Sequence, residues 1–138
     1  MRKLSLLLIL LISFSATSEE TISRWMADYF ERIHKHIANE NYEKAQAELI
    51  LGDTNYFRNG RTYEAALLYQ LYGQFFAVQS QYTNAIPWFE KALASEQMPR
   101  IGEQEVRFQL AQTYFMVGKY DNVIPLLEDF IVVGEKYK

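Results

Sequence analysis

Apolar residues recur three and four positions apart along most of the chain from Trp25 onward. Tyr69, Tyr72 and Phe76 follow this spacing, and so does the run that begins at Tyr82 and continues through Ala85, Phe89 and Ala92. Such a period places apolar side chains on one face of an α-helix. Short polar breaks at 39–41, 80–81 and 118–119 are typical of tight turns. The pattern therefore predicts an all-α fold built from pairs of antiparallel helices.

The pattern also repeats. The interval from Gly73 to Ala111 recurs between four other pairs of similar residues: Tyr82 and Tyr120, Ala85 and Val123, Phe89 and Leu127, and Pro87 and Pro125. Upstream, Tyr42, Ala45 and Leu49 precede Tyr82, Ala85 and Phe89 by one common interval, which is slightly longer. A fixed period of about 40 residues indicates a repeat architecture. We expect three copies of a helix hairpin, at about 26–59, 66–99 and 104–137, the first of them degenerate.

Each hairpin needs small residues where its helices cross and large residues around that point. Ile33 and His36 depart from this pattern in the first copy. Pro87 and Pro125 are expected near the start of the second helix of their hairpins, where few amide hydrogens have an intrahelical partner to lose. The predicted structural positions of the repeat are Gly73, Tyr82, Ala85, Phe89, Ala92, Ala111, Tyr114 and Tyr120.

The alternation of small and aromatic positions, with the segment Ala85-x-x-x-Phe89-Glu90-Lys91-Ala92-Leu93, resembles the tetratricopeptide repeat. This resemblance implies a right-handed α-α superhelix, or solenoid, of about three helix hairpins. The family period is about 34 residues. The additional residues of this chain are expected in loops between the repeats, near 96–102 and 52–62.

The first eighteen residues have the layout of a secretory signal peptide. Arg2 and Lys3 precede an apolar run at 4–12, and small residues follow. The run is far shorter than the roughly 20 residues that span a bilayer. Cleavage is expected after Ser18, or alternatively after Ser15, and an uncleaved N-terminal anchor is the other interpretation. The predicted organisation is a signal peptide at 1–18 and a repeat domain at 19–138 that works in the periplasm without a membrane span of its own.

The amino-acid composition of the chain argues against several kinds of binding and catalytic site. The chain has 138 residues, a net charge of −3 and no cysteine, and aromatic residues make up 15% of it. An acidic balance with no basic stripe argues against nucleic-acid binding. The absence of cysteine excludes disulfides, thiolate zinc sites and cysteine nucleophiles.

Sequence features of an enzyme are sparse. The chain has no Gly-x-Ser-x-Gly segment and no glycine-rich phosphate loop, and its six glycines are dispersed, most of them expected at helix ends. Ser80 and Ser95 fall at a turn and at a helix end, where capping is the ordinary role. His34 and His36 point about 200° apart on a helix, so they cannot bind one metal together. We therefore expect no catalytic site, no metal and no cofactor; a hydrolase or metal enzyme built around Glu31, His34 and His36 is the competing hypothesis.

The resemblance implies that the first helix of each hairpin lines a concave binding surface. The lysine, arginine and asparagine clamp that grips C-terminal carboxylates in such domains is missing here, so an extended or helical protein segment with apolar anchors fits better. Alternatively, Phe108 and Phe115 simply pack against the next helix. The predicted groove comprises Phe30, His34 and Ile37, then Leu67, Gln70, Gln74 and Val78, and finally Phe108, Gln112, Phe115 and Met116.

A narrower resemblance rests on the signal peptide, the degenerate first copy and two segments. These are Tyr63-Glu64-x-Ala66-Leu67-x-x-Gln70-x-x-Gly73 and Arg107-Phe108-x-Leu110-Ala111-Gln112-x-Tyr114. Together they are similar to the periplasmic tetratricopeptide proteins that accompany TonB energy-transduction systems in Gram-negative bacteria. The resemblance implies a non-catalytic scaffold whose partner is an envelope protein, with the TonB, ExbB and ExbD complex as the candidate. A scaffold for pilus, secretion or cell-wall assembly is the alternative.

The expected last helix, 120–138, is apolar on more than one side, with Leu126, Phe130, Ile131 and Val133 among its residues. Solenoids usually close with a polar capping helix. We therefore expect that this chain is the N-terminal part of a longer array, or that its end packs on a partner or on a second copy.

Overall fold

A computed structural model describes residues 22–56 and 62–135 of the chain. This part contains six α-helices and no strand: α1 (Arg24–Ala38), α2 (Tyr42–Tyr56), α3 (Tyr63–Val78), α4 (Tyr82–Ala94), α5 (Arg100–Met116) and α6 (Tyr120–Glu135). The predicted all-α class is confirmed. The predicted signal peptide at 1–18 lies outside the described residues.

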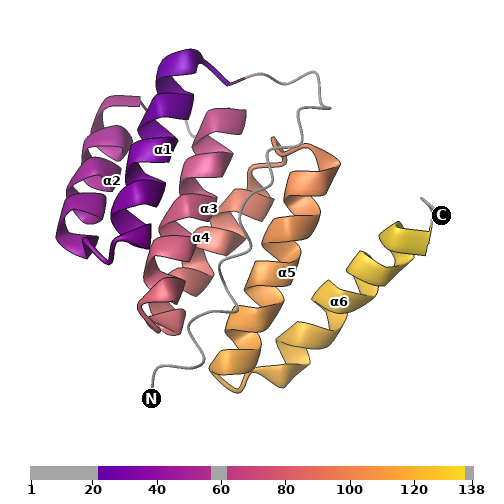
Figure 1. Ribbon diagram of the computed structural model, residues 1–138. Coiled ribbons are helices and arrows are strands. Elements are labelled where there is room, and N and C mark those ends of the chain that lie inside the picture. Colours follow the sequence, from indigo (N-terminus) through magenta and orange to yellow (C-terminus); the bar gives the residue numbers. More distant parts are fainter. Residues whose placement is uncertain (1–21, 57–61, 136–138) are drawn as a thin grey trace.

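The helices pack in chain order. Each one lies against the next, and Figure 1 shows α1 and α2 on one side, α3 and α4 in the middle, and α5 and α6 on the other side. At the start of α3 the hydroxyl oxygen of Thr62 accepts a hydrogen bond from the backbone N–H of Ala65, so that helix has a side-chain N-cap. The carboxylate of Glu64 beside it accepts hydrogen bonds from the N–H and the hydroxyl of Ser23, which ties the beginning of α1 to α3.

The three turns between paired helices are built alike. Glu40, Ser80 and Gly118 each have a left-handed φ, at 56°, 60° and 76°. The following residue donates its N–H to a carbonyl five positions back: Asn41 to His36, Gln81 to Phe76 and Lys119 to Tyr114, at 2.8, 2.9 and 2.9 Å. This is the bond that closes a Schellman-type helix end. The turns lie at the predicted polar breaks, and their spacing along the chain equals that of the sequence repeat.

Two apolar clusters form the core. The first joins α1 and α2 to α3, and Met26, Ile33, Leu49 and Leu68 are fully enclosed in it. The second joins the end of α3 to α4 and α5, with Phe89 and Val106 fully buried. Because α3 contributes to both clusters, it is the element on which the hairpins before and after it pack.

Gly73 permits the close approach of α3 and α4. A Cβ atom at Gly73 would lie 2.5 Å from a ring carbon of Phe89, which is fully buried. No side chain fits at that distance unless the Phe89 ring or the helices shift. The absence of a side chain at Gly73 is therefore a packing requirement of this hairpin.

The expected loop at 52–62 is partly wrong, because α2 continues to Tyr56 and contains Gly52. A Cβ atom at Gly52 would lie 2.0 Å from the hydroxyl oxygen of Tyr29, and that hydroxyl donates a hydrogen bond of 2.7 Å to the carbonyl of Glu48. Gly52 thus makes room for a tyrosine of α1 instead of ending a helix. Gly102, expected in a loop at 96–102, is likewise inside a helix, because α5 begins at Arg100.

The two prolines also lie deeper in their helices than expected. Pro87 is the sixth residue of α4, and Pro125 occupies the same place in α6. Each removes one intrahelical hydrogen bond, which in α4 would have ended on the carbonyl of Thr83. Thr83 and Pro87 are both exposed, so the gap in the hydrogen bonding of α4 is on its solvent side.

Replacing Gly73 by alanine should lower the free energy of unfolding by about 1–3 kcal/mol, because the added methyl group collides with the ring of Phe89. Gly102→Ala is the matched control. Its Cβ would meet only Met98, at 3.5 Å, so alanine should gain up to about 1 kcal/mol from its better helix propensity. Urea unfolding of both variants measures the difference, and equal effects at the two positions would contradict the close-contact explanation.

The turns allow a second pair of substitutions. Ser80→Gly should stabilise the protein by about 1 kcal/mol, because Ser80 is exposed and a left-handed φ is unfavourable for a residue with a Cβ. Gly118→Ala should destabilise it by a similar amount, since nothing lies within 4 Å of the new methyl group and only backbone strain changes. Thermal unfolding should show melting temperatures that move in opposite directions.

Candidate partner-binding surface

All the residues of the predicted groove lie on the first helices of the three hairpins. Phe30, His34 and Ile37 are on α1; the set from Leu67 to Val78 is on α3; and the set from Phe108 to Met116 is on α5. What the structure adds is the accessibility of each side chain.

Four of these side chains are buried, namely Phe30, Leu67, Gln70 and Gln74. Phe30 and Leu67 belong to the first core cluster, which joins α1 and α2 to α3. The side chains of the predicted groove that reach solvent are therefore the half-buried and exposed ones. His34, Ile37, Val78, Phe108 and Gln112 are half-buried, and Phe115 and Met116 are exposed.

Gln70 connects two of the first helices. Its side-chain amide donates a hydrogen bond of 3.1 Å to the carbonyl oxygen of Gln109 on α5, and both residues are buried. Buried amides are stable only when their hydrogen bonds are made, so this pair holds α3 and α5 at a defined distance. Gln70 was predicted in the groove, whereas a role for Gln109 was not predicted. The sequence signal that could have identified Gln109 was an amide side chain on an otherwise buried face of its helix.

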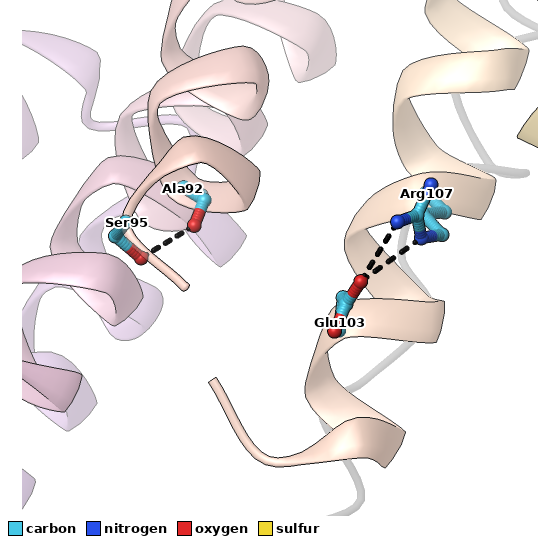
Figure 2. Close-up of polar contacts among 4 residues, drawn as sticks. All are labelled: Ala92, Ser95, Glu103 and Arg107. Atoms are coloured by element: carbon cyan, nitrogen blue, oxygen red, sulfur yellow. Dashed lines mark hydrogen bonds and ion pairs between the residues drawn. The ribbon is translucent and has the colours of Figure 1, made fainter. Parts of the chain in front are cut away.

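The polar groups of α5 also have defined environments. Burial raises the pKa of Glu105 above its ordinary value. The side-chain oxygen of its neighbour Gln104 is buried and has no hydrogen-bond partner among the described residues. Glu103 and Arg107 form an ion pair of 2.8 Å within the same helix, drawn in Figure 2. The half-buried part of the surface is thus mainly apolar and amide-bearing, with Glu105 as an acidic group.

His34 is half-buried on α1, two residues before His36 on the same helix. Burial lowers the pKa of His34, so its ring is neutral at pH 7. Within residues 22–56 and 62–135, no three His, Cys, Asp or Glu side chains are grouped so that they could hold a metal ion.

Ser95 has a structural role, because its hydroxyl donates a hydrogen bond of 2.6 Å to the carbonyl of Ala92 at the end of α4 (Figure 2).

Two further features were not predicted. On α3 and α4, Trp88 stacks on Tyr72 with ring centroids 4.1 Å apart, and the ammonium group of Lys91 lies 4.8 Å from the centre of the Trp88 ring. Burial and the charge of Asp53 raise the pKa of Tyr72 to about 12. The sequence signal of the stack between Trp88 and Tyr72 was the pair of aromatic residues Tyr69 and Tyr72, three positions apart.

The second feature lies between α4 and α5, where the hydroxyl of Tyr114 donates a hydrogen bond to Glu90. Burial is the larger cause and this hydrogen bond the next, and together they raise the pKa of Tyr114 to about 12.

No helix within the described residues is both long and apolar enough to cross a membrane.

The Gln70–Gln109 hydrogen bond is tested by a double-mutant cycle. Gln70→Leu should lower the free energy of unfolding by about 1–3 kcal/mol, because it leaves the buried carbonyl oxygen of Gln109 unpaired. Replacing both residues by leucine should cost less than the sum of the single substitutions, since no amide then remains unpaired. Denaturant unfolding measures all four proteins, and additive effects would show that the two side chains do not interact.

Comparisons of the chain with protein-family models, with curated proteins and with solved structures find no match.

Proposed function

We propose that this chain is a tetratricopeptide-type superhelix that works as a non-catalytic scaffold for protein–protein interaction in the periplasm. The observation that carries the proposal is the equivalence of the three turns between paired helices. Each turn has a left-handed residue and the same hydrogen bond to a carbonyl five positions back, and the turns recur with the period of the sequence repeat. Hairpins with equivalent turns that pack in chain order are the building units of a helical solenoid.

The packing within and between hairpins supports the same proposal. Where the paired helices α3 and α4 cross, the small residue Gly73 faces the large residue Phe89. The Gln70–Gln109 hydrogen bond joins the first helices of successive hairpins. A solenoid of this type presents its first helices on a continuous inner face. The accessible side chains there include Phe108 and Gln112 of α5 and Val78 of α3.

The chemistry of that face suits a protein segment. Apolar anchors such as Phe108 bury the apolar positions of an extended or helical peptide, and the carboxamide of Gln112 offers both a donor and an acceptor to its backbone. The surface offers no grouping of metal ligands among the described residues. Under this proposal the scaffold binds a protein segment without a reaction of its own, and its partner is an envelope protein.

The resemblance in sequence makes a TonB-type energy-transduction system the proposed setting. Under this proposal residues 1–18 direct export, and the repeat domain links components of the TonB, ExbB and ExbD complex from the periplasmic side.

The proposal is tested by crosslinking in living cells of the native host. A tagged full-length protein is crosslinked, isolated and analysed by mass spectrometry. Recovery of TonB, ExbB or ExbD is expected, and Phe108→Glu should reduce it at least about fivefold, because a charge replaces an apolar anchor. Ile101→Glu is the matched control, since Ile101 is an exposed apolar residue of the same helix outside the predicted groove. Circular dichroism establishes that both variants fold.

Other outcomes would redirect the assignment. Recovery of other envelope proteins, with the same dependence on Phe108, would contradict the TonB assignment and leave the scaffold proposal standing. Recovery that is unaffected by Phe108→Glu would contradict the groove. The intact mass of the isolated protein tests the leader, since cleavage after Ser18 leaves Glu19 as the first residue, and a purely cytoplasmic pool would contradict the proposed compartment.

A further inference from the structure

Three aromatic side chains on the central hairpin, which we call the aromatic cluster, lie outside the predicted groove. They are Tyr69 and Tyr72 of α3 and Trp88 of α4. Trp88 stacks on Tyr72 with an angle of 11° between the ring planes. The ring of Tyr69 lies 6.1 Å from that of Trp88 and is tilted by 32° to it. Tyr72 is buried, whereas Tyr69 and Trp88 are half-buried and therefore reach solvent.

The aromatic cluster holds a cation, the side-chain ammonium of Lys91. The nitrogen of this group lies 4.8 Å from the centre of the Trp88 ring and 5.5 Å from that of the Tyr69 ring. Both are distances of a cation–π contact, in which the negative face of a ring attracts a positive charge. Within residues 22–56 and 62–135, no carboxylate forms an ion pair with this ammonium. The two rings are therefore what attracts it to this place.

The rings stay in position when the lysine leaves. Tyr72 packs in the first core cluster and supports the indole of Trp88 from one side. Because Tyr72 covers that face of the indole, the ammonium of Lys91 occupies the opposite face. Lys91 itself is exposed and has no such support. Its ammonium can thus move into water and leave two ring faces open to another cation.

The ring faces that attract Lys91 suit a quaternary ammonium ion better than they suit a lysine. The ammonium of lysine is strongly hydrated, and it gives up part of this hydration when it approaches a ring. A trimethylammonium group carries the same charge without N–H groups, so it loses less on leaving water. Its methyl groups also make apolar contact with the rings. Aromatic side chains are accordingly a common recognition surface for such ions.

The charge beside the aromatic cluster favours a cation that has no acidic group. Asp53 of α2 is exposed, and its charge contributes, after burial, to the raised pKa of Tyr72. This carboxylate attracts a cationic ligand and repels an attached phosphate or carboxylate. Choline has the required chemistry, whereas the headgroup of phosphatidylcholine carries a phosphate next to its trimethylammonium group.

We propose that the aromatic cluster binds small quaternary ammonium cations such as choline, and that Lys91 occupies the site in their absence. The ligand and the lysine compete for the same faces of Tyr69 and Trp88. None of these side chains belongs to the predicted groove, so this inference does not depend on the proposed scaffold function.

The competition is tested with the full chain carrying Trp25→Phe, which leaves Trp88 as its only tryptophan. Choline at constant ionic strength should change the fluorescence of Trp88 in a saturable way at millimolar concentrations. Lys91→Ala should lower the Kd at least about threefold, because the tethered cation no longer competes. Lys119→Ala is the matched control. Lys119 is exposed and lies on a turn away from the aromatic cluster, so its loss removes the same charge and should leave the Kd unchanged.

Two comparisons establish what is recognised. The neutral isostere of choline, in which carbon replaces the nitrogen, should bind at least about tenfold more weakly, because it has the methyl groups without the charge. Tyr69→Leu, added to the Lys91→Ala chain, keeps Trp88 and removes one ring, so it should weaken choline binding at least about threefold. Circular dichroism establishes that each variant folds.

Four results would each overturn the proposal. They are a Lys91→Ala chain without a saturable response to choline, equal binding of the neutral isostere, an effect of Lys119→Ala as large as that of Lys91→Ala, and binding to phosphatidylcholine vesicles without binding of free choline.

Discussion

The structure depends most on the contact between the backbone of Gly73 and the ring of Phe89. At this point α3 and α4 come so close that a single methyl group would collide with the ring. The contact fixes how the second hairpin is assembled, and α3 then contributes to both apolar clusters. The first hairpin packs on one side of α3, and α5 packs at its end. A change in the α3–α4 distance would thus be felt in both clusters, because protein interiors are close-packed.

The first hairpin solves the same packing problem with different residues. Its close contact is made by Gly52 of α2 with Tyr29 of α1, whereas the position equivalent to Gly73 carries the buried Ile33. In the first hairpin the small residue is therefore on the second helix and the large residue is on the first helix, the reverse of the arrangement in α3 and α4. This exchange explains why the first copy looks degenerate in sequence although its turn has the same geometry as the other two.

Where helices pack in chain order, each apolar face is covered by its neighbour, and only the outer helices of the described part keep a face exposed. Here α1 presents Trp25, Asp28 and Arg32, and α5 and α6 present Phe115, Tyr120 and Ile124. The predicted groove is divided in a related way. Gln70 and Gln74 are enclosed, while Phe108 and Gln112 stay partly accessible, because α5 belongs to the last hairpin that the structure describes.

The helical class, the turns and the period could all be predicted from the amino-acid sequence, because all three depend on local rules. Helix periodicity requires apolar residues three and four positions apart, and the hydrogen bonds of a turn join residues at most five positions apart. The helix periodicity was visible in residues such as Tyr82 and Phe89. The positions of the turns were visible in the polar breaks at 39–41, 80–81 and 118–119.

The accessibility of each side chain and the identity of its close neighbours emerged only when the helices were packed together. The role of Gly52 depends on Tyr29, which is distant in sequence, and the burial of Gln70 depends on Gln109, which lies on another helix. Likewise Ile86 and Ile124 occupy the same position of the repeat, yet one is buried and the other exposed. Burial is a property of the neighbouring helix, and the spacing of residues within one helix carries no information about what covers it.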